Sequence, residues 1–195
     1  TARDRQLMDR NLESYVKIYK GLLEKDLCEN VVSVLNMQKF QGHTFYDPKT
    51  GESSTHEEDL QVLDGGSSDP NFKILMSKFK DSFNTYAEEL EFPWFNKANS
   101  FCIYRYNKYL PNTRMSEHCD HIHSIFDGQR KGVPLLTSLG FLNNEFKGGD
   151  LVLFQDTKIE VEAGDMVVFP SNFMYPHRVD KVTEGVRYSV VSWAW

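Results

Sequence analysis

The chain has 195 residues, a net charge of −6, and 40% hydrophobic residues including 13% aromatics. This composition is typical of one globular domain with a sizeable core, and it excludes a disordered chain. The acidic balance disfavours a nucleic-acid partner, because phosphate binding needs a basic surface.

The cysteines Cys28, Cys102 and Cys119 are odd in number, widely spaced and without a Cys-x-x-Cys motif. Scattered cysteines of this kind are typical of reduced thiols rather than of a disulfide framework. No apolar run approaches the roughly 18 residues that span a bilayer, and no secretory signal pattern opens the sequence. We therefore expect an intracellular, cytoplasmic protein without a membrane partner, folded as a single domain over residues 1–195.

Residues 1–95 are expected to form a helical support region. Residues 14–22 alternate and predict a short strand with one half-buried face. Asp26 is expected to cap a first helix, and Asp69 with Pro70 to begin a second helix that ends near Pro93. The polar, acidic stretch 51–69 between these helices predicts a surface loop, or alternatively a lid over a substrate groove.

After Pro93 the helical period gives way to short alternating runs separated by Gly, Asn and Pro. The sequence predicts eight strands in residues 96–195, near 99–107, 114–121, 134–142, 150–154, 158–162, 166–169, 174–180 and 186–194. Strands of this length and spacing indicate a barrel or sandwich of jelly-roll type. We therefore predict a mainly β, α+β fold with its N-terminal helices packed on one sheet.

Three residues predict a metal site. Side chains two apart on a strand project from the same face, so His118 and Asp120 can reach one ion, and His177 can complete the set. Two imidazoles and one carboxylate with vacant positions suit non-heme Fe(II). Arg187, ten residues after His177, is placed to bind a carboxylate in bidentate fashion. Alone, the His-x-Asp pair is more typical of a surface strand and Arg187 of a structural ion pair; the combination favours the metal site.

The same residues belong to an ordered set of motifs in residues 101–195. The set comprises Tyr-Arg-Tyr at 104–106, Glu-His-Cys-Asp at 117–120, Leu-Gly-Phe-Leu-Asn at 139–143, Gly-Gly-Asp-Leu at 148–151, Ala-Gly-Asp at 163–165, His-Arg-Val at 177–179 and Arg-Tyr-Ser at 187–189. In this order they resemble the double-stranded β-helix (jelly-roll, cupin-like) core of Fe(II)/2-oxoglutarate-dependent oxygenases, particularly the prolyl-hydroxylase branch.

The resemblance implies Fe(II), with 2-oxoglutarate and O2 as co-substrates and ascorbate as the expected reductant. It assigns the far carboxylate of 2-oxoglutarate to Arg187 and a hydroxyl contact to Tyr106, with Tyr104 as the fallback. Phe141 stands where some prolyl hydroxylases carry a Tyr that also holds this carboxylate. Ser189 and Thr137 are the expected replacements.

For the substrate, the resemblance implies hydroxylation of a carbon with release of succinate and CO2, first of all peptidyl-proline 4-hydroxylation. Trp193, Tyr104, His123 and Arg114 are the tentative substrate contacts. His121 and His123 form a second pair, expected at the rim of the site rather than as ligands. A basic group that includes Arg105 is compatible with a carboxylate-bearing peptide and equally with a solvated loop.

Two alternatives stay open from the sequence. The same core supports hydroxylation of a free amino acid or another small molecule. The second alternative is a non-catalytic metal-binding β-barrel. Arg187 and Tyr106 argue against it, because a protein that only stores metal needs no residues that bind a carboxylate.

Overall fold

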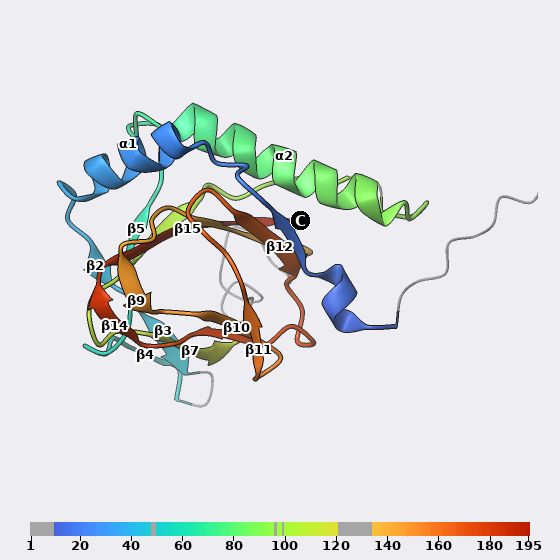
Figure 1. Ribbon diagram of the computed structural model, residues 1–195. Helices are drawn as coiled ribbons and strands as arrows, with labels where there is room; N and C mark the ends of the chain where they lie inside the picture. The colour runs from blue at the N-terminus through green and yellow to red at the C-terminus, as the bar shows by residue number, and fades with distance from the viewer. Residues whose placement is uncertain (1–9, 48–49, 96, 99, 121–133) are drawn as a thin grey trace, which may run out of the picture.

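The computed structural model describes residues 10–47, 50–95, 97–98, 100–120 and 134–195. His121 and His123, and with them the expectation of a histidine at the rim of the site, lie outside these residues. The described chain forms a β-barrel-like core with two helices laid across one side (Figure 1). None of the described helices is both long and apolar enough to cross a membrane.

The N-terminal half contains both α-helices and five short strands. These elements are a 3-10 turn at Leu12–Tyr15, β1 (Lys17–Tyr19), α1 (Lys25–Leu35), β2 (Gln41–Gly42), β3 (Phe45–Asp47), β4 (Glu52–Ser54), β5 (Gln61–Asp64) and α2 (Phe72–Leu90). The remaining strands are β6 (Arg105–Tyr109), β7 (Met115–His118), β8 (Leu136–Phe141), β9 (Phe146–Gly148), β10 (Leu151–Leu153), β11 (Thr157–Ile159), β12 (Met166–Pro170), β13 (His177–Val179), β14 (Val182–Gly185) and β15 (Arg187–Ala194).

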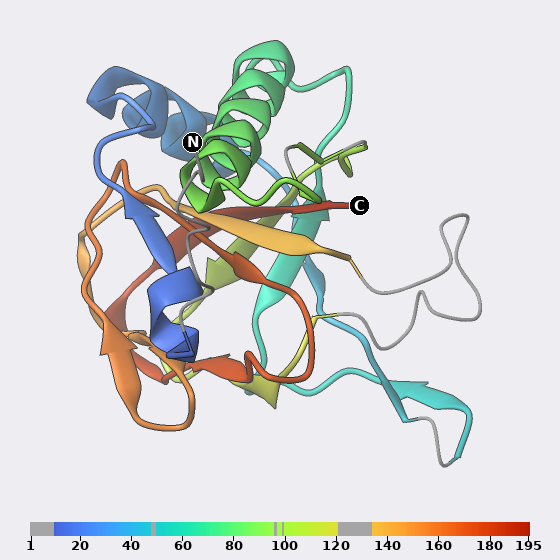
Figure 2. The ribbon, with the colours of Figure 1, turned by 90° about the vertical axis from the view of Figure 1, so that its right-hand side faces the viewer.

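Two sheets face each other across the barrel. The larger has seven strands in the order β1-β12-β8-β15-β6-β5-β2, and the smaller has four in the order β11-β10-β13-β7. Neighbouring strands within both sheets are antiparallel. The pair β14-β9 lies at one end of the barrel (Figure 1), and the β3-β4 hairpin extends away from the barrel (Figure 2). This arrangement confirms the predicted mainly β fold of double-stranded β-helix type.

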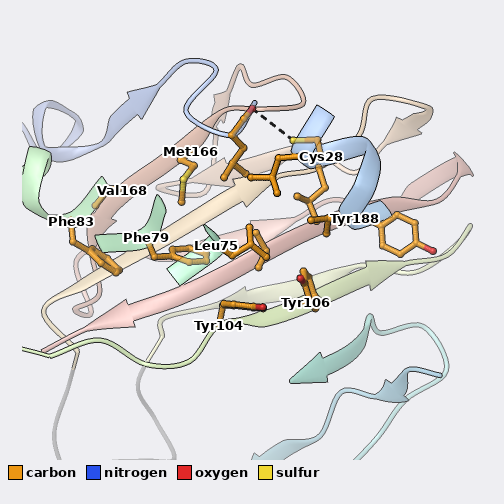
Figure 3. Close-up of a cluster of buried hydrophobic side chains, with 14 of the residues drawn as sticks. Cys28, Leu75, Phe79, Phe83, Tyr104, Tyr106, Met166, Val168 and Tyr188 are labelled. Carbon is orange, nitrogen blue, oxygen red and sulfur yellow. Dashed lines mark hydrogen bonds between the residues drawn. The ribbon is translucent and has the colours of Figure 1, made fainter. Parts of the chain in front are cut away.

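The large sheet is buried on both faces, so its strands separate two hydrophobic clusters. On β12, Met166 and Val168 face the helices, whereas Val167 and Phe169 face the barrel interior. The helix-side cluster contains the fully buried Phe79 of α2 and extends over the sheet in Figure 3. Covered faces on both sides explain why β12 is a continuous apolar run, Met-Val-Val-Phe, rather than an alternation.

Three local expectations were wrong. Helix α1 begins at Lys25 with Glu24 at the N-cap, so Asp26 lies in the first turn, where a negative charge still favours the helix dipole. Helix α2 has Asn71 at its N-cap, and Asp69 instead accepts a hydrogen bond from the backbone N–H of Asn71 at 2.8 Å. The stretch 51–69 is not one loop, because it contains β4 and β5.

The N-terminal region supplies β1, β5 and β2 to the same sheet as the C-terminal strands. The β1 edge is fixed by Asp165, whose carboxylate accepts hydrogen bonds from the Lys20 ammonium at 2.7 Å and the backbone N–H groups of Gly21 and Glu162 at 3.0 and 2.9 Å. Burial alone would raise the pKa of Asp165, but these donors and the charge of Lys20 lower it. Its ionised form therefore connects β1 to the turn before β12.

Asp165→Asn is expected to destabilise the fold by about 1–3 kcal/mol at pH 7, since it turns an amide N–H toward a backbone donor. A folded-state pKa below the ordinary value means that this stabilisation is present above the ordinary Asp pKa and is lost as the pH falls through the folded-state pKa. Urea unfolding of both proteins should show a difference that shrinks below about pH 4. The exposed Asp156→Asn is the control; a constant difference down to pH 3 would contradict the role of the carboxylate.

Candidate active site

The three predicted ligands meet on the small sheet. His118 ends β7, and the register of the β7–β13 pair places it directly opposite His177. Their ring centroids are 4.3 Å apart. Asp120 follows just beyond the end of β7, with its Oδ1 atom 3.2 Å from Nε2 of His118 and 3.7 Å from Nε2 of His177. The ligand atoms of all three residues lie within 4.8 Å of one another.

Backbone carbonyls orient both imidazoles. Nδ1 of His118 donates to the carbonyl oxygen of Ser116 at 2.8 Å, and Nδ1 of His177 donates to that of Tyr175 at 3.1 Å. These bonds fix the proton on Nδ1 and leave Nε2 of each ring directed at Asp120. Such outer contacts are what a metal-binding histidine needs for a defined tautomer and ring orientation.

Asp120 is held from the opposite side by two donors. Its Oδ2 atom accepts hydrogen bonds from Thr137 Oγ1 at 2.9 Å and from the indole N–H of Trp193 at 3.0 Å. Burial would raise the pKa of Asp120, but the electrostatic influence of His177 and His118, the hydrogen bond from His118 and the bond from Trp193 hold it well below its usual range. Oδ1 is thus an ionised ligand atom facing the two imidazoles.

The histidines differ in protonation. Burial and the charge of His118 lower the pKa of His177 to about 4, so its ring is neutral near pH 7. For His118, burial disfavours the charged form, but the hydrogen bond and charge of Asp120, with the bond to the Ser116 carbonyl, together raise the pKa. A cation bound at the two Nε2 atoms would take the place of a proton there. Two nitrogen donors and one carboxylate fit an Fe(II) ion with open coordination positions.

Arg187 lies at the other end of the barrel interior and is fully buried, with 1% of its surface exposed. Nη1 donates to Ser189 Oγ at 3.2 Å, and the guanidinium carbon lies 4.7 Å from the ring centre of Tyr109 and 5.2 Å from that of Phe141. Its Nε and Nη2 atoms have no hydrogen-bond partner among the described residues. A buried, unpaired guanidinium is costly, so this geometry fits a carboxylate ligand.

Gly149 lets the Gly-Gly-Asp turn pass close to Arg187. Its φ is +67°, a left-handed conformation, and a Cβ atom there would lie 3.0 Å from Arg187 Cδ and 2.9 Å from Val182 Cγ2. A larger residue would be strained and would press on the guanidinium. The glycine of this motif therefore serves both the turn and the space around Arg187.

The register of β6 corrects the assignment of Tyr106. Tyr104 and Tyr106 face the helices, where both hydroxyls donate to Asp69 Oδ2, at 2.7 and 2.6 Å. Their position in that cluster is visible in Figure 3. Tyr106 therefore does not reach the co-substrate pocket, and Tyr104 fails both as its fallback and as a substrate contact.

The pocket face of β6 instead carries Arg105, Asn107 and Tyr109. The sequence predicted a strand ending at residue 107, and carrying the alternation two residues further would have put Tyr109 on the face opposite Tyr106. Tyr109 is buried against Arg187, and burial raises its pKa. It is the tyrosine that the motif comparison missed.

The remaining candidates divide by position. Trp193 lines the cavity with the three ligands, as expected. Thr137 also lines the cavity, but its hydroxyl bonds Asp120 and Ser171 rather than reaching Arg187. In the β8–β15 register Thr137 lies opposite Trp193, whereas Phe141, four residues further along β8, lies opposite Ser189. Arg114 is exposed and pairs with Glu58 at 3.2 Å, so it is not placed in the cavity. His123 lies outside the described residues.

Residues 103–195 match the profile of the 2OG-Fe(II) oxygenase superfamily. The matched segment contains the complete His-Asp-His set, Arg187 and Tyr109. Over this segment, just under half of its length, the chain is similar to that superfamily.

Curated relatives of the chain are named hydroxylases. A PKHD-type hydroxylase of Aliarcobacter butzleri is 33% identical over 97 residues, which cover 46% of this chain and 41% of that protein. A PKHD-type hydroxylase of Rippkaea orientalis is 45% identical over 53 residues, covering 26% and 23% of the two chains. The chain thus spans less than half the length of these relatives.

Solved structures of prolyl hydroxylases share the oxygenase fold over most of the chain. A Pseudomonas putida prolyl-4-hydroxylase superposes with a TM-score of 0.65 at 19% identity, covering 92% of each chain. A Trichoplax adhaerens prolyl hydroxylase, in complex with a peptide fragment of the hypoxia inducible factor oxygen degradation domain, gives 0.68 at 17% identity, covering 93% of this chain and 83% of that one. At these identities the likeness establishes the fold.

Thr137→Ala should lower metal affinity by about 10- to 100-fold, because Asp120 loses one of the two donors that orient it. The measurement is an anaerobic titration with Fe(II), and with Co(II) as a spectroscopic probe. Thr137→Ser should restore most of the affinity, since it keeps the hydroxyl. Ser192→Ala is the control, because it removes a hydroxyl from the face of β15 opposite Trp193, where Ser192 bonds the Cys102 carbonyl. Equal losses of metal affinity in the two alanine variants would contradict the orienting role of Thr137.

Proposed function

We propose that this protein is an Fe(II)- and 2-oxoglutarate-dependent dioxygenase, with residues 1–195 acting as one oxygenase domain and with ascorbate as a reductant that keeps the iron ferrous. The observation that carries the proposal is the unpaired Arg187 in the same barrel interior as the His-Asp-His set. A protein that only stores metal has no need of a buried cation that lacks an anionic partner. The superfamily match supports the same conclusion.

Each residue of the site has a distinct task in this proposal. His118, Asp120 and His177 would hold the metal, while Thr137 and Trp193 keep the Asp120 carboxylate turned toward it. Bound Fe(II) would supply the centre at which O2 and 2-oxoglutarate react, giving succinate, CO2 and a hydroxylated substrate carbon.

At the deep end of the barrel, Arg187 and Ser189 would bind the far carboxylate of 2-oxoglutarate. Tyr109 would contribute a hydroxyl contact and, together with Phe141, an apolar wall that excludes water. A charge-assisted contact is stronger when water is excluded, so burial of Arg187 favours a tight co-substrate site.

The proposed substrate is a prolyl residue in a peptide or protein, hydroxylated at C4. Support comes from the shared fold of the prolyl hydroxylases, one of which was solved with a peptide. The relatives of higher identity are named hydroxylases without a stated substrate, so a free amino acid or another small molecule is the competing outcome.

The test is succinate release by purified protein supplied with Fe(II), ascorbate, O2 and 2-oxoglutarate, with and without proline-containing peptides. Peptide-stimulated succinate and a peptide heavier by one oxygen atom would establish both reaction and substrate class. Succinate without peptide stimulation would retain the oxygenase and reject the peptide substrate. Metal-loaded protein that releases no succinate would reject the oxygenase.

Arg187→Met should raise the KM for 2-oxoglutarate at least 100-fold, since a buried carboxylate without its cation costs several kcal/mol. Arg187→Lys should recover part of the affinity lost in Arg187→Met, because lysine keeps the positive charge but cannot bind the carboxylate in bidentate fashion. Metal binding should stay unchanged, as the guanidinium lies outside the ligand set. Unchanged co-substrate affinity in Arg187→Met would show that another group holds the carboxylate.

The two faces of β6 allow a paired comparison. Tyr109→Phe should weaken 2-oxoglutarate binding by roughly 10- to 150-fold, the value of one hydrogen bond to a charged group. Tyr106→Phe should leave that binding unchanged and instead lower the unfolding temperature, because the Asp69 contact is lost. Calorimetric binding of 2-oxoglutarate and thermal unfolding separate the two effects; the opposite pattern would return the co-substrate role to Tyr106.

A further inference from the structure

A second guanidinium enters the barrel interior beside the metal ligands. Arg105 begins β6 and lines the same cavity as His118, Asp120, His177 and Trp193. Unlike Arg187, it is only partly covered, and it stands at the end of the barrel where the ligands themselves keep some exposure, 22% for the His118 side chain and 12% for that of Asp120. Arg105 is therefore accessible from the cavity in which a substrate must meet the metal.

Neutral partners hold this side chain in place. Its Nε donates to Asn107 Oδ1 at 3.1 Å, and its guanidinium carbon lies 5.4 Å from the ring centre of Trp193. Stacking on an indole and one amide contact orient an arginine without neutralising it. In the described part of the chain no carboxylate lies within ion-pair distance of Arg105, and the charges of Asp120 and Asp64 act on it only from farther away.

Two cations in one barrel need two different anions. The fully buried Arg187 lies at the closed end, against Tyr109 and Phe141, and suits the co-substrate. Arg105 lies at the metal end, stacked on Trp193, whose indole N–H holds Asp120. A ligand held by Arg105 would thus lie in the same cavity as the ligand set and separate from the co-substrate anchor.

We propose that Arg105 is a specificity-determining residue that binds a carboxylate of the substrate next to the carbon that is hydroxylated. The inference rests on the proposed oxygenase function and narrows its substrate class to carboxylate-bearing molecules. That carboxylate belongs to an acidic residue adjacent to the target in a peptide, to a peptide C-terminus, or to a free amino acid. A planar guanidinium pre-oriented by Trp193 and Asn107 binds such a group in bidentate fashion.

The test compares substrates that differ only in one charge. The peptide probes are capped Gly-Glu-Pro-Gly and Gly-Pro-Glu-Gly, each compared with the peptide in which Gln replaces Glu. N-acetylproline, compared with N-acetylprolinamide, represents a terminal carboxylate. Free proline represents an amino acid substrate. Wild-type protein should favour the acid of a matched pair over its amide by roughly 10- to 100-fold in KM. In Arg105→Gln this preference should fall to within about twofold, while the KM for 2-oxoglutarate and the metal affinity stay at wild-type values.

Lys108→Gln is the matched control, because it removes a cation from the same strand on the face that packs on Phe40 and Tyr188. It should keep the acid preference intact. If Arg105→Gln instead weakens metal binding and slows all probes alike, Arg105 only positions Trp193 and Asp120, and the inference is overturned. A wild-type protein that turns over acids and amides equally overturns it as well.

Failure of the proposed function would look different. If no probe stimulates succinate release, calorimetric binding of N-acetylproline to metal-loaded protein without O2 still tests the contact. Binding of the acid, its absence for the amide, and its loss in Arg105→Gln would support the carboxylate site independently of turnover. Equal binding of the acid by wild type and Arg105→Gln, or no binding by either, would reject it.

Discussion

The site depends on a single buried carboxylate that four side chains hold in place. Asp120 stands beyond the end of β7, where the strand no longer fixes it, and donors from β8 and β15 supply its orientation. Thr137 and Trp193 are cross-strand neighbours in the β8–β15 pair, so the large sheet presents both donors together. The His-Asp-His geometry is therefore produced by both sheets, although the two histidines belong to one.

Closure of the barrel follows from the same constraint. The small sheet carries the two histidines. The large sheet carries Thr137 and Trp193, which orient Asp120, and also Arg187 at the far end of the barrel. A displacement of one sheet relative to the other would separate Asp120 from its donors. The helix-side cluster, with α2 packed across the large sheet, and the Asp165 contacts at the β1 edge restrict such displacement.

Sequence periodicity was sufficient for residues whose roles follow from spacing along one strand. His118 and Asp120 are two apart and lie close together, as their spacing predicted, and Arg187 and Ser189, also two apart, share a hydrogen bond. The ordered turns and apolar runs also gave the fold and the positions of most C-terminal strands. The short strands β9 and β14 were not expected, since their pairing depends on a contact between distant turns rather than on a local pattern.

Prediction failed where a side chain's partner depends on strand parity or on a residue distant in sequence. Tyr106 and Tyr109 are both aromatic residues before the metal motif, and only the register against β15 decides which one faces the barrel. Asp69 had the pattern of an N-cap, but two tyrosine hydroxyls more than thirty residues away also use it as an acceptor. Thr137 was assigned to the wrong end of the barrel, because only the β8–β15 register fixes its distance from Arg187.

The placement of two arginines within one barrel follows an electrostatic limit. A buried guanidinium loses its hydration, and a second one close by would add repulsion unless each has its own counter-charge. Here Arg187 and Arg105 occupy opposite ends of the cavity region, and each is stabilised first by aromatic rings, Tyr109 and Phe141 for one and Trp193 for the other. Ring stacking holds each cation without using its hydrogen-bond donors for a protein carboxylate. Both cations thereby keep donors for the anionic ligands that we propose, Arg105 at the end of the barrel that holds the His-Asp-His set and Arg187 at the other end.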